Sequence, residues 1–173
     1  MGKIKTILHL SDIHIRKLHR FVEYREVFNR LYKQAKQLKP DLIYVGGDIV
    51  HGKLDTSPEE TRMVANFFLQ LSQISTTIII PGNHDCNLNN NYRLDVLTPI
   101  VENLNNDRIH YLRDTGIYPF HNLTFVVYSI LDNQENWPKG ELVEGENTIC
   151  LFHGPVNLAQ TDIGYTVSSN SFR

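Results

Sequence analysis

The stretch TTIIIPGNHD, residues 76–85, shows the pattern that decides the fold. Its first five residues are β-branched, a run that is too stiff and too short for a helix and typical of a buried strand. The run stops at a Pro-Gly pair, and the polar side chains of Asn83, His84 and Asp85 follow directly. A buried strand that ends in such side chains predicts a site at the carboxyl end of a sheet.

Three more apolar runs end in polar residues of the same kinds. Residues 6–10 precede Asp12 and His14, residues 42–45 precede Asp48, and residues 148–152 precede His153. Between these runs, apolar positions at helical spacing predict helices over 24–38 and 58–71, the second of them with Ser57 as its N-cap. Because the carboxyl ends of strands in an open α/β sheet meet at one edge, we expect the polar endings to converge.

In the second half of the chain, the predicted strands no longer alternate regularly with helices. After a helix predicted through 94–104, the runs 109–112, 116–120 and 123–130 indicate closely spaced strands, more antiparallel than parallel. Repeated β-α units followed by strands predict an α/β fold with a mixed sheet flanked by helices. A chain of 173 residues is of single-domain size, so we expect one domain over residues 1–173.

Composition limits the classes of function. Hydrophobic residues make up 41% of the chain and charged residues 21%, which is typical of a globular protein. The net charge of -2 lacks the strongly basic balance of nucleic-acid binders, so any DNA contact must be local or metal-assisted. Cys86 and Cys150 indicate reduced thiols, and the N-terminus shows neither a secretory leader nor a membrane span. We therefore expect an intracellular protein of the cytoplasm or nucleus, with no membrane partner.

The polar endings share one ligand chemistry. Carboxylate, amide and imidazole groups suit borderline divalent metals such as Mn, Fe or Zn, and they do not suit soft thiolate chemistry. Asp12 and His14 lie two residues apart in an extended segment, so their side chains point the same way and can hold one ion together. A metal site is the simplest common cause of the four endings.

These motifs, in this order, resemble those of the calcineurin-like metallophosphoesterases over residues 7–154. The resemblance implies an αββα sandwich of two mixed sheets flanked by helices, and a centre of two divalent ions, Mn in the first place with Fe or Zn as alternatives. It assigns the metal ligands as Asp12, His14, Asp48, Asn83 and His153, with Asp48 between the two ions.

The segment Gly47-Asp48-Ile49-Val50-His51 is similar to the second motif of the SbcD nucleases and their meiotic-recombination relatives. There, a histidine three places after the aspartate approaches the substrate phosphate, which implies a catalytic and substrate-binding role for His51. The resemblance further implies that His84 meets the phosphate or the leaving oxygen, that Asp85 orients its ring, and that Asn83 also contacts substrate. The implied function is a DNA exonuclease or endonuclease of double-strand break repair or recombination, with DNA and an SbcC-type ATPase as partners and a homodimer as a further expectation.

One family motif is absent. Gly-His-X-His normally follows the His153 element and gives one ligand to each ion, but no histidine follows His153 here. We therefore expect the domain to be incomplete at its C-terminus, and the activity of this chain stays open. A phosphatase or small-molecule phosphodiesterase, or a non-catalytic scaffold on the same fold, remain as alternatives.

Two features are left open by the sequence. Arg16, Lys17, His19 and Arg20 form a basic cluster that either meets a DNA backbone or is a solvated loop. His9, inside the first strand, is expected to be a packed or hydrogen-bonded residue rather than a ligand.

Overall fold

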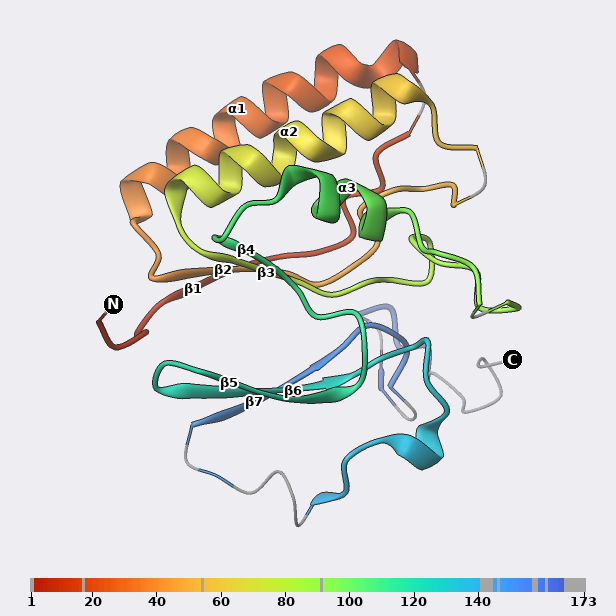
Figure 1. Cartoon of the computed structure of the whole chain (residues 1–173). Coiled ribbons are helices and arrows are strands. Elements are labelled where there is room, and N and C mark those ends of the chain that lie inside the picture. The colour runs from red at the N-terminus through yellow and green to blue at the C-terminus, as the bar shows by residue number, and fades with distance from the viewer. Residues whose placement is uncertain are drawn as a thin grey trace.

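The computed structural model describes residues 2–16, 18–53, 55–90, 92–140, 145, 147–156, 159–160 and 162–166. Helices, a four-stranded sheet and a three-stranded sheet form successive layers (Figure 1). The strands are β1 (Ile7–Leu10), β2 (Leu42–Val45), β3 (Thr77–Ile79), β4 (Ile109–Tyr111), β5 (Gly116–Phe120), β6 (Leu123–Tyr128) and β7 (Thr148–Phe152). The helices are α1 (Phe21–Leu38), α2 (Pro58–Ile74) and α3 (Leu97–Leu104), with 3-10 turns η1 (Leu18–Arg20) and η2 (Gln134–Asn136).

The first sheet has the order β1-β2-β3-β4, and its strands are parallel. Side chains alternate across it, because successive residues of a strand point to opposite faces. Ile43 and Val45 of β2 pack against the helices together with Phe67 of α2, while Leu42 and Tyr44 face the second sheet. The parallel arrangement places the carboxyl ends of β1, β2 and β3 at one edge.

The second sheet has the order β5-β6-β7 and lies on the face of the first sheet that is not covered by α1–α3 (Figure 1). β5 and β6 form an antiparallel hairpin, and β7 is parallel to β6. Phe125, Val127 and Leu151 pack between the two sheets against Leu42 and Ile78. Because of this packing, the end of β7 reaches the same edge as the ends of β1–β3.

The predicted α/β fold with two sheets and flanking helices is confirmed. The N-cap of α2 is also confirmed, since the Ser57 hydroxyl accepts a hydrogen bond from the backbone amide of Glu60 at 3.1 Å. The expectation of a hairpin-rich second half is wrong for β4, which pairs in parallel with β3 in the first sheet. The parallel pairing of β3 with β4 is possible because α3 forms the crossover connection that parallel strands require. The short length of β4 does not indicate from the sequence which sheet it joins. Two mixed sheets were predicted; among the described residues the first sheet is parallel and the second is mixed.

No helix in the described part of the chain is long and apolar enough to cross a membrane. A single domain over residues 1–173, incomplete at its C-terminus, stays a prediction.

Candidate metal centre

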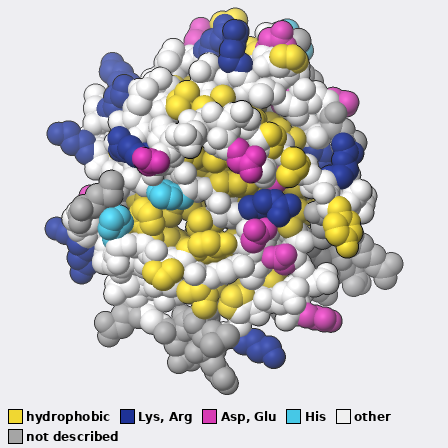
Figure 2. All heavy atoms as spheres, in the orientation of Figure 1, with side chains coloured by type: hydrophobic (Ala, Val, Ile, Leu, Met, Phe, Trp, Pro, Cys, Tyr) yellow, Lys and Arg dark blue, Asp and Glu magenta, His cyan; other side chains and the backbone are white. Residues whose placement is uncertain are grey.

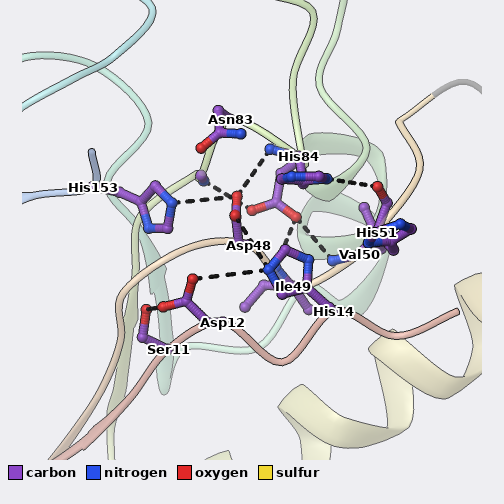
Figure 3. A network of polar contacts seen from close by, with 12 residues as sticks. Ser11, Asp12, His14, Asp48, Ile49, Val50, His51, Asn83, His84 and His153 are labelled. Carbon is purple, nitrogen blue, oxygen red and sulfur yellow. Dashed lines mark hydrogen bonds and ion pairs between the residues drawn. The ribbon is translucent and has the colours of Figure 1, made fainter. Parts of the chain in front are cut away.

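The polar endings predicted from the sequence meet at one place (Figure 3). Asp12 follows β1, Asp48 follows β2, Asn83 follows β3 and His153 follows β7. Backbone hydrogen bonds continue beyond β1 and β2: the amide of Asp12 donates to Gly47 at 3.1 Å, and that of His14 donates to Asp48 at 2.9 Å. The loops that carry the first two motifs are therefore fixed to each other by the backbone.

Asp48 lies at the middle of the cluster, with His153 on one side and His14 and His84 on the other (Figure 3). Its Oδ2 is 3.5 Å from Nε2 of His14, its Oδ1 is 3.3 Å from Nε2 of His153, and Oδ1 also accepts from the amide of His84 at 2.9 Å. Burial alone would raise the pKa of Asp48, but the His153 ring and the His84 amide outweigh it and lower the pKa below 3.8. The carboxylate is thus ionised and can serve ligand groups on both sides.

Three of the predicted ligands have left-handed backbone conformations, with φ of 56° at Asp12, 48° at His14 and 54° at Asp48. Side chains other than glycine rarely adopt this region, at a cost of about 1 kcal/mol or more per residue. Such conformations persist where surrounding contacts impose them, and they gather at functional sites. No local pattern in the sequence indicates these backbone conformations.

Gly82 allows the β3 loop to approach Asp48. A Cβ atom at this position would lie 2.2 Å from the backbone nitrogen and from Oδ1 of Asp48. Gly47 has a φ of 91°, and a Cβ there would lie 2.8 Å from Nδ1 of His153. These two glycines are therefore needed for the close packing of the ligand loops.

His153 brings the second sheet into the site. Its Nδ1 lies 2.6 Å from the carbonyl oxygen of Gly46, so Nδ1 donates and Nε2 faces Asp48. This is the arrangement in which a histidine presents a defined nitrogen to a metal. Burial lowers the pKa of His153, but the Asp48 carboxylate and the Gly46 carbonyl raise it to about 8.

His14, His51 and His84 form a second group, whose ligand nitrogens all lie within 4.8 Å of one another. The rings of His51 and His84 are stacked at 5.2 Å with an angle of 22° between planes. Nδ1 of His84 lies 2.7 Å from the carbonyl oxygen of His51, so Nδ1 donates and Nε2 is left to act in the site. His51 itself is exposed.

The expectation that Asp85 orients the ring of His84 is wrong. The Asp85 carboxylate is buried and accepts from three backbone amides, those of Ile49 at 2.9 Å, Val50 at 3.0 Å and Gly82 at 2.8 Å. Burial raises the pKa of Asp85 to about 7, against the three amide donors, which favour the ionised form. Asp85 thus joins the loop after β2 to the loop after β3 by hydrogen bonds, and it fixes the positions of the two loops that carry Asp48 and Asn83.

The remaining predicted residues lie at the rim. The Asp12 side chain is 62% exposed, its Oδ1 is 3.8 Å from Nε2 of His14, and the Ser11 hydroxyl donates to its Oδ2. Asn83 is half-buried beside Asp48 (Figure 3), and its backbone carbonyl oxygen accepts from the Lys53 ammonium at 3.3 Å. All the predicted ligands therefore lie in one place, and their roles stay predictions.

Sequence reasoning missed Tyr24 of α1. Its hydroxyl donates to the backbone carbonyl oxygen of His14 at 2.6 Å and so holds the left-handed segment of the first motif. From the sequence, Tyr24 is one of the apolar positions at helical spacing that predict the helix over 24–38, and nothing local distinguishes it from the others. His9 was expected to be a packed or hydrogen-bonded core residue; its ring lies 4.8 Å from that of Tyr44, but His9 is exposed on β1 and is not part of the core.

The residues fit a divalent metal. Asp12, His14 and Asp48 offer ligand atoms that all lie within 4.8 Å of one another, as His14, His51 and His84 do. The atoms are oxygens and nitrogens, which suit borderline divalent ions. A cavity of about 500 Å³ adjoins the cluster, and it is lined by Asp12, Asp48, Asn83, His84 and His153 among others.

Comparison with known proteins supplies the family. The model of the family described as calcineurin-like phosphoesterase matches residues 5–173. An uncharacterised protein of Acanthamoeba polyphaga mimivirus is 43% identical over 182 residues, covering 96% of this chain and 13% of that protein. The chain therefore spans a small part of the length of this relative.

A crystal structure of a nuclease from Pseudomonas putida is similar with a TM-score of 0.45 and 17% sequence identity. The match covers 70% of this chain and 52% of the nuclease chain. A likeness of this degree carries no information about activity.

Proposed function

This chain belongs to the calcineurin-like phosphoesterase family, and on that premise we propose that it hydrolyses phosphodiester bonds of DNA, as a nuclease of the SbcD type. The family consists of hydrolases that act on phosphoric esters with divalent metals. The observation that carries the nuclease assignment is the place of His51, whose ring stacks on that of His84 at 5.2 Å. The motif that resembles the nucleases thus contributes its distinguishing histidine to the site.

The metal ligands proposed are Asp12 and His14 for one ion, Asn83 and His153 for the other, and Asp48 for both. When bound, divalent ions, Mn²⁺ in the first place with Fe or Zn as alternatives, polarise phosphoryl oxygens and lower the pKa of a coordinated water. Two of the proposed ligands are already in a form that can bind a metal. The carboxylate of Asp48 is ionised, and the hydrogen bond from Nδ1 of His153 to the Gly46 carbonyl oxygen leaves Nε2 to face the site.

His84 is the proposed proton donor to the leaving oxygen. Its Nδ1 is engaged by the carbonyl of His51, so only Nε2 can exchange a proton with substrate. An imidazole in this role contributes about 10² to 10⁴-fold to the rate. His51 is proposed to contact the substrate phosphate, and Asn83 to contact substrate as well as an ion.

The biological role proposed is DNA double-strand break repair or recombination, with an SbcC-type ATPase as partner and a homodimer as the assembly. These expectations rest on the resemblance of the motif around Asp48 and His51 alone.

A second candidate is a phosphatase or small-molecule phosphodiesterase on the same fold. The charge of the chain favours it: the net charge is -2, and on the face seen in Figure 2 Lys and Arg side chains are interspersed with Asp and Glu rather than gathered. A surface of this kind does not attract a polyanion over a wide area. A non-catalytic scaffold is disfavoured, because His14, His84 and His153 are all present in the site.

The deciding experiment measures hydrolysis of bis-nitrophenyl phosphate and of linear duplex DNA, with and without Mn²⁺. The wild-type chain is compared with His84→Ala and His51→Ala, and a longer chain that continues past residue 173 is measured beside it. A nuclease cuts both substrates in a metal-dependent and His84-dependent way. Hydrolysis of the ester without any cleavage of DNA favours the second candidate, and the absence of both activities and of metal binding in the longer chain favours the scaffold.

A further inference from the structure

Arg16 lies next to the proposed substrate histidine. Beyond β1 and β2, residues Ile15 and Val50 form a parallel bridge, with the amide of Ile15 donating to Ile49 at 2.8 Å and that of His51 donating to Ile15 at 3.0 Å. This pairing places the side chains of Arg16 and His51 side by side. Nη1 of Arg16 lies 3.4 Å from Nε2 of His51.

In the hydrogen bond between Arg16 and His51, the donor must be Arg16. A guanidinium has only donors, so Nε2 of His51 must accept and the ring proton must be on Nδ1. The contact occupies one N–H group of Arg16, and the guanidinium has four others. Those groups remain available to an anion that reaches the exposed side of His51.

Arg20 and Arg30 differ from Arg16 in their partners. Arg20 donates to the Glu23 carboxylate at 2.7 and 2.9 Å, and Arg30 lies 3.9 Å from the Glu26 carboxylate. Arg16 is half-buried and, in the described part of the chain, has no carboxylate within ion-pair distance. The structure thus separates Arg16 from Arg20, two residues of the basic cluster that the sequence left undivided.

The site needs a local cation if its substrate is a polymer. The chain carries 17 basic and 19 acidic residues, and Asp12 and Asp48 add negative charge at the centre itself. A strand of nucleic acid presents a charge about every 3.4 Å of helix rise, so the phosphate beside the scissile one lies a short step from the centre. Arg16 contacts His51 and so lies next to the residue that is proposed to touch the scissile phosphate.

We infer that Arg16 binds a second phosphate of the substrate, adjacent to the one at the metal centre, and thereby selects polynucleotides over single phosphodiesters. This inference rests on the proposed function and adds a binding residue for a polyanionic ligand. The planar guanidinium suits this role, because it can give two parallel hydrogen bonds to one phosphate.

The test compares Arg16→Gln with Arg20→Gln, a matched control in the same segment whose guanidinium is held by Glu23. The two substrates are bis-nitrophenyl phosphate, which has one phosphodiester, and a short single-stranded DNA oligonucleotide, both with Mn²⁺. In Arg16→Gln, kcat/KM should fall about tenfold more for the oligonucleotide than for the ester, as expected for one charge-assisted hydrogen bond. Arg20→Gln should leave both values close to wild type.

A binding measurement separates a phosphate contact from an effect on His51. Oligonucleotide affinity is measured without added metal over a range of salt concentrations, and Arg16→Gln should reduce the slope of log affinity against log salt by about 0.7. Combined with His51→Ala, the Arg16→Gln change should still lower oligonucleotide affinity, because the guanidinium acts on the phosphate directly.

Three results would overturn the inference. Equal losses of kcat/KM on both substrates, with an unchanged salt slope, would show that Arg16 acts only through His51, while the nuclease function would stand. No further effect of Arg16→Gln in the His51→Ala background would lead to the same conclusion. If the wild-type protein hydrolyses the ester but neither binds nor cuts the oligonucleotide, the proposed nuclease function itself fails, and the second-phosphate site fails with it.

Discussion

Nδ1 of His84 lies 2.7 Å from the backbone carbonyl oxygen of His51, so the loop after β2 holds the imidazole that extends from the loop after β3. The contact uses the backbone of His51 rather than its side chain. This hydrogen bond to His84 is therefore independent of the identity of residue 51, and the two histidines can be tested separately.

Replacing His84 by Ala should lower kcat for the ester and for DNA by about 10² to 10⁴-fold, because the proposed proton donor is lost. Metal binding should be largely retained, since the amide of residue 84 still donates to Asp48. Steady-state kinetics and calorimetric Mn²⁺ titration measure the two effects. A variant with full activity would remove His84 from the mechanism.

His51→Ala should reduce DNA cleavage at least tenfold more than ester hydrolysis, because one hydrogen bond to a charged phosphate is lost while the backbone carbonyl that holds His84 is kept. The comparison is of kcat/KM on both substrates. Equal losses would count against a nuclease site.

Gly82→Ala should destabilise the protein by about 1–3 kcal/mol and weaken metal binding, because its Cβ would lie 2.2 Å from Oδ1 of Asp48. Gly52→Ala is the matched control, since nothing lies within 4 Å of a Cβ at that position. Urea denaturation and Mn²⁺ titration provide the measurements. Equal behaviour of the two variants would contradict the close approach of the β3 loop to Asp48.

Asp95 should make stability depend on pH in the acid range. Burial raises its pKa, but hydrogen bonds from Thr98, Tyr111 and Arg113 outweigh it, and the folded pKa lies below 3.8. A depressed pKa gives stability that is present above pH 3.8 and lost as the pH falls through the folded value. Asp95→Asn should therefore cost about 3 kcal/mol at neutral pH and much less in strong acid.

Urea denaturation at neutral and acid pH measures this dependence, with Asp107→Asn as an exposed control. A cost for Asp95→Asn that does not change with pH would show that the carboxylate charge is not what stabilises the junction of α3 and β4.

His153 should give the opposite dependence when no divalent metal is added. Its pKa is raised from 6.5 to about 8, so its ion pair with Asp48 stabilises the fold below pH 6.5 and is lost as the pH rises through about 8. Thermal denaturation from neutral to alkaline pH should show this loss in the wild type and not in His153→Gln. Added Mn²⁺ should reverse it, because metal binding requires the deprotonated imidazole.

The sequence predicted most of what is local. The β-branched run before Asn83, the glycines beside Asp48 and the Ser57 cap each depend on a few neighbouring residues, and each was placed correctly. The Tyr24 hydroxyl meets a carbonyl oxygen ten residues away, and two of the amides at Asp85 lie 36 and 35 residues away in sequence, so no local pattern encodes these contacts. β4 was misplaced for the same reason, because a strand of three residues does not indicate which sheet it joins.

His153 extends from β7 in the second sheet, whereas the other proposed ligands follow strands of the first. An ion bound by both Asp48 and His153 would link the two sheets of the sandwich. The binding free energy of the ion would then include the free energy of packing one sheet on the other. Any fluctuation that parts the sheets would release the ion, so metal retention reports on the integrity of the whole sandwich rather than of the ligand loops alone.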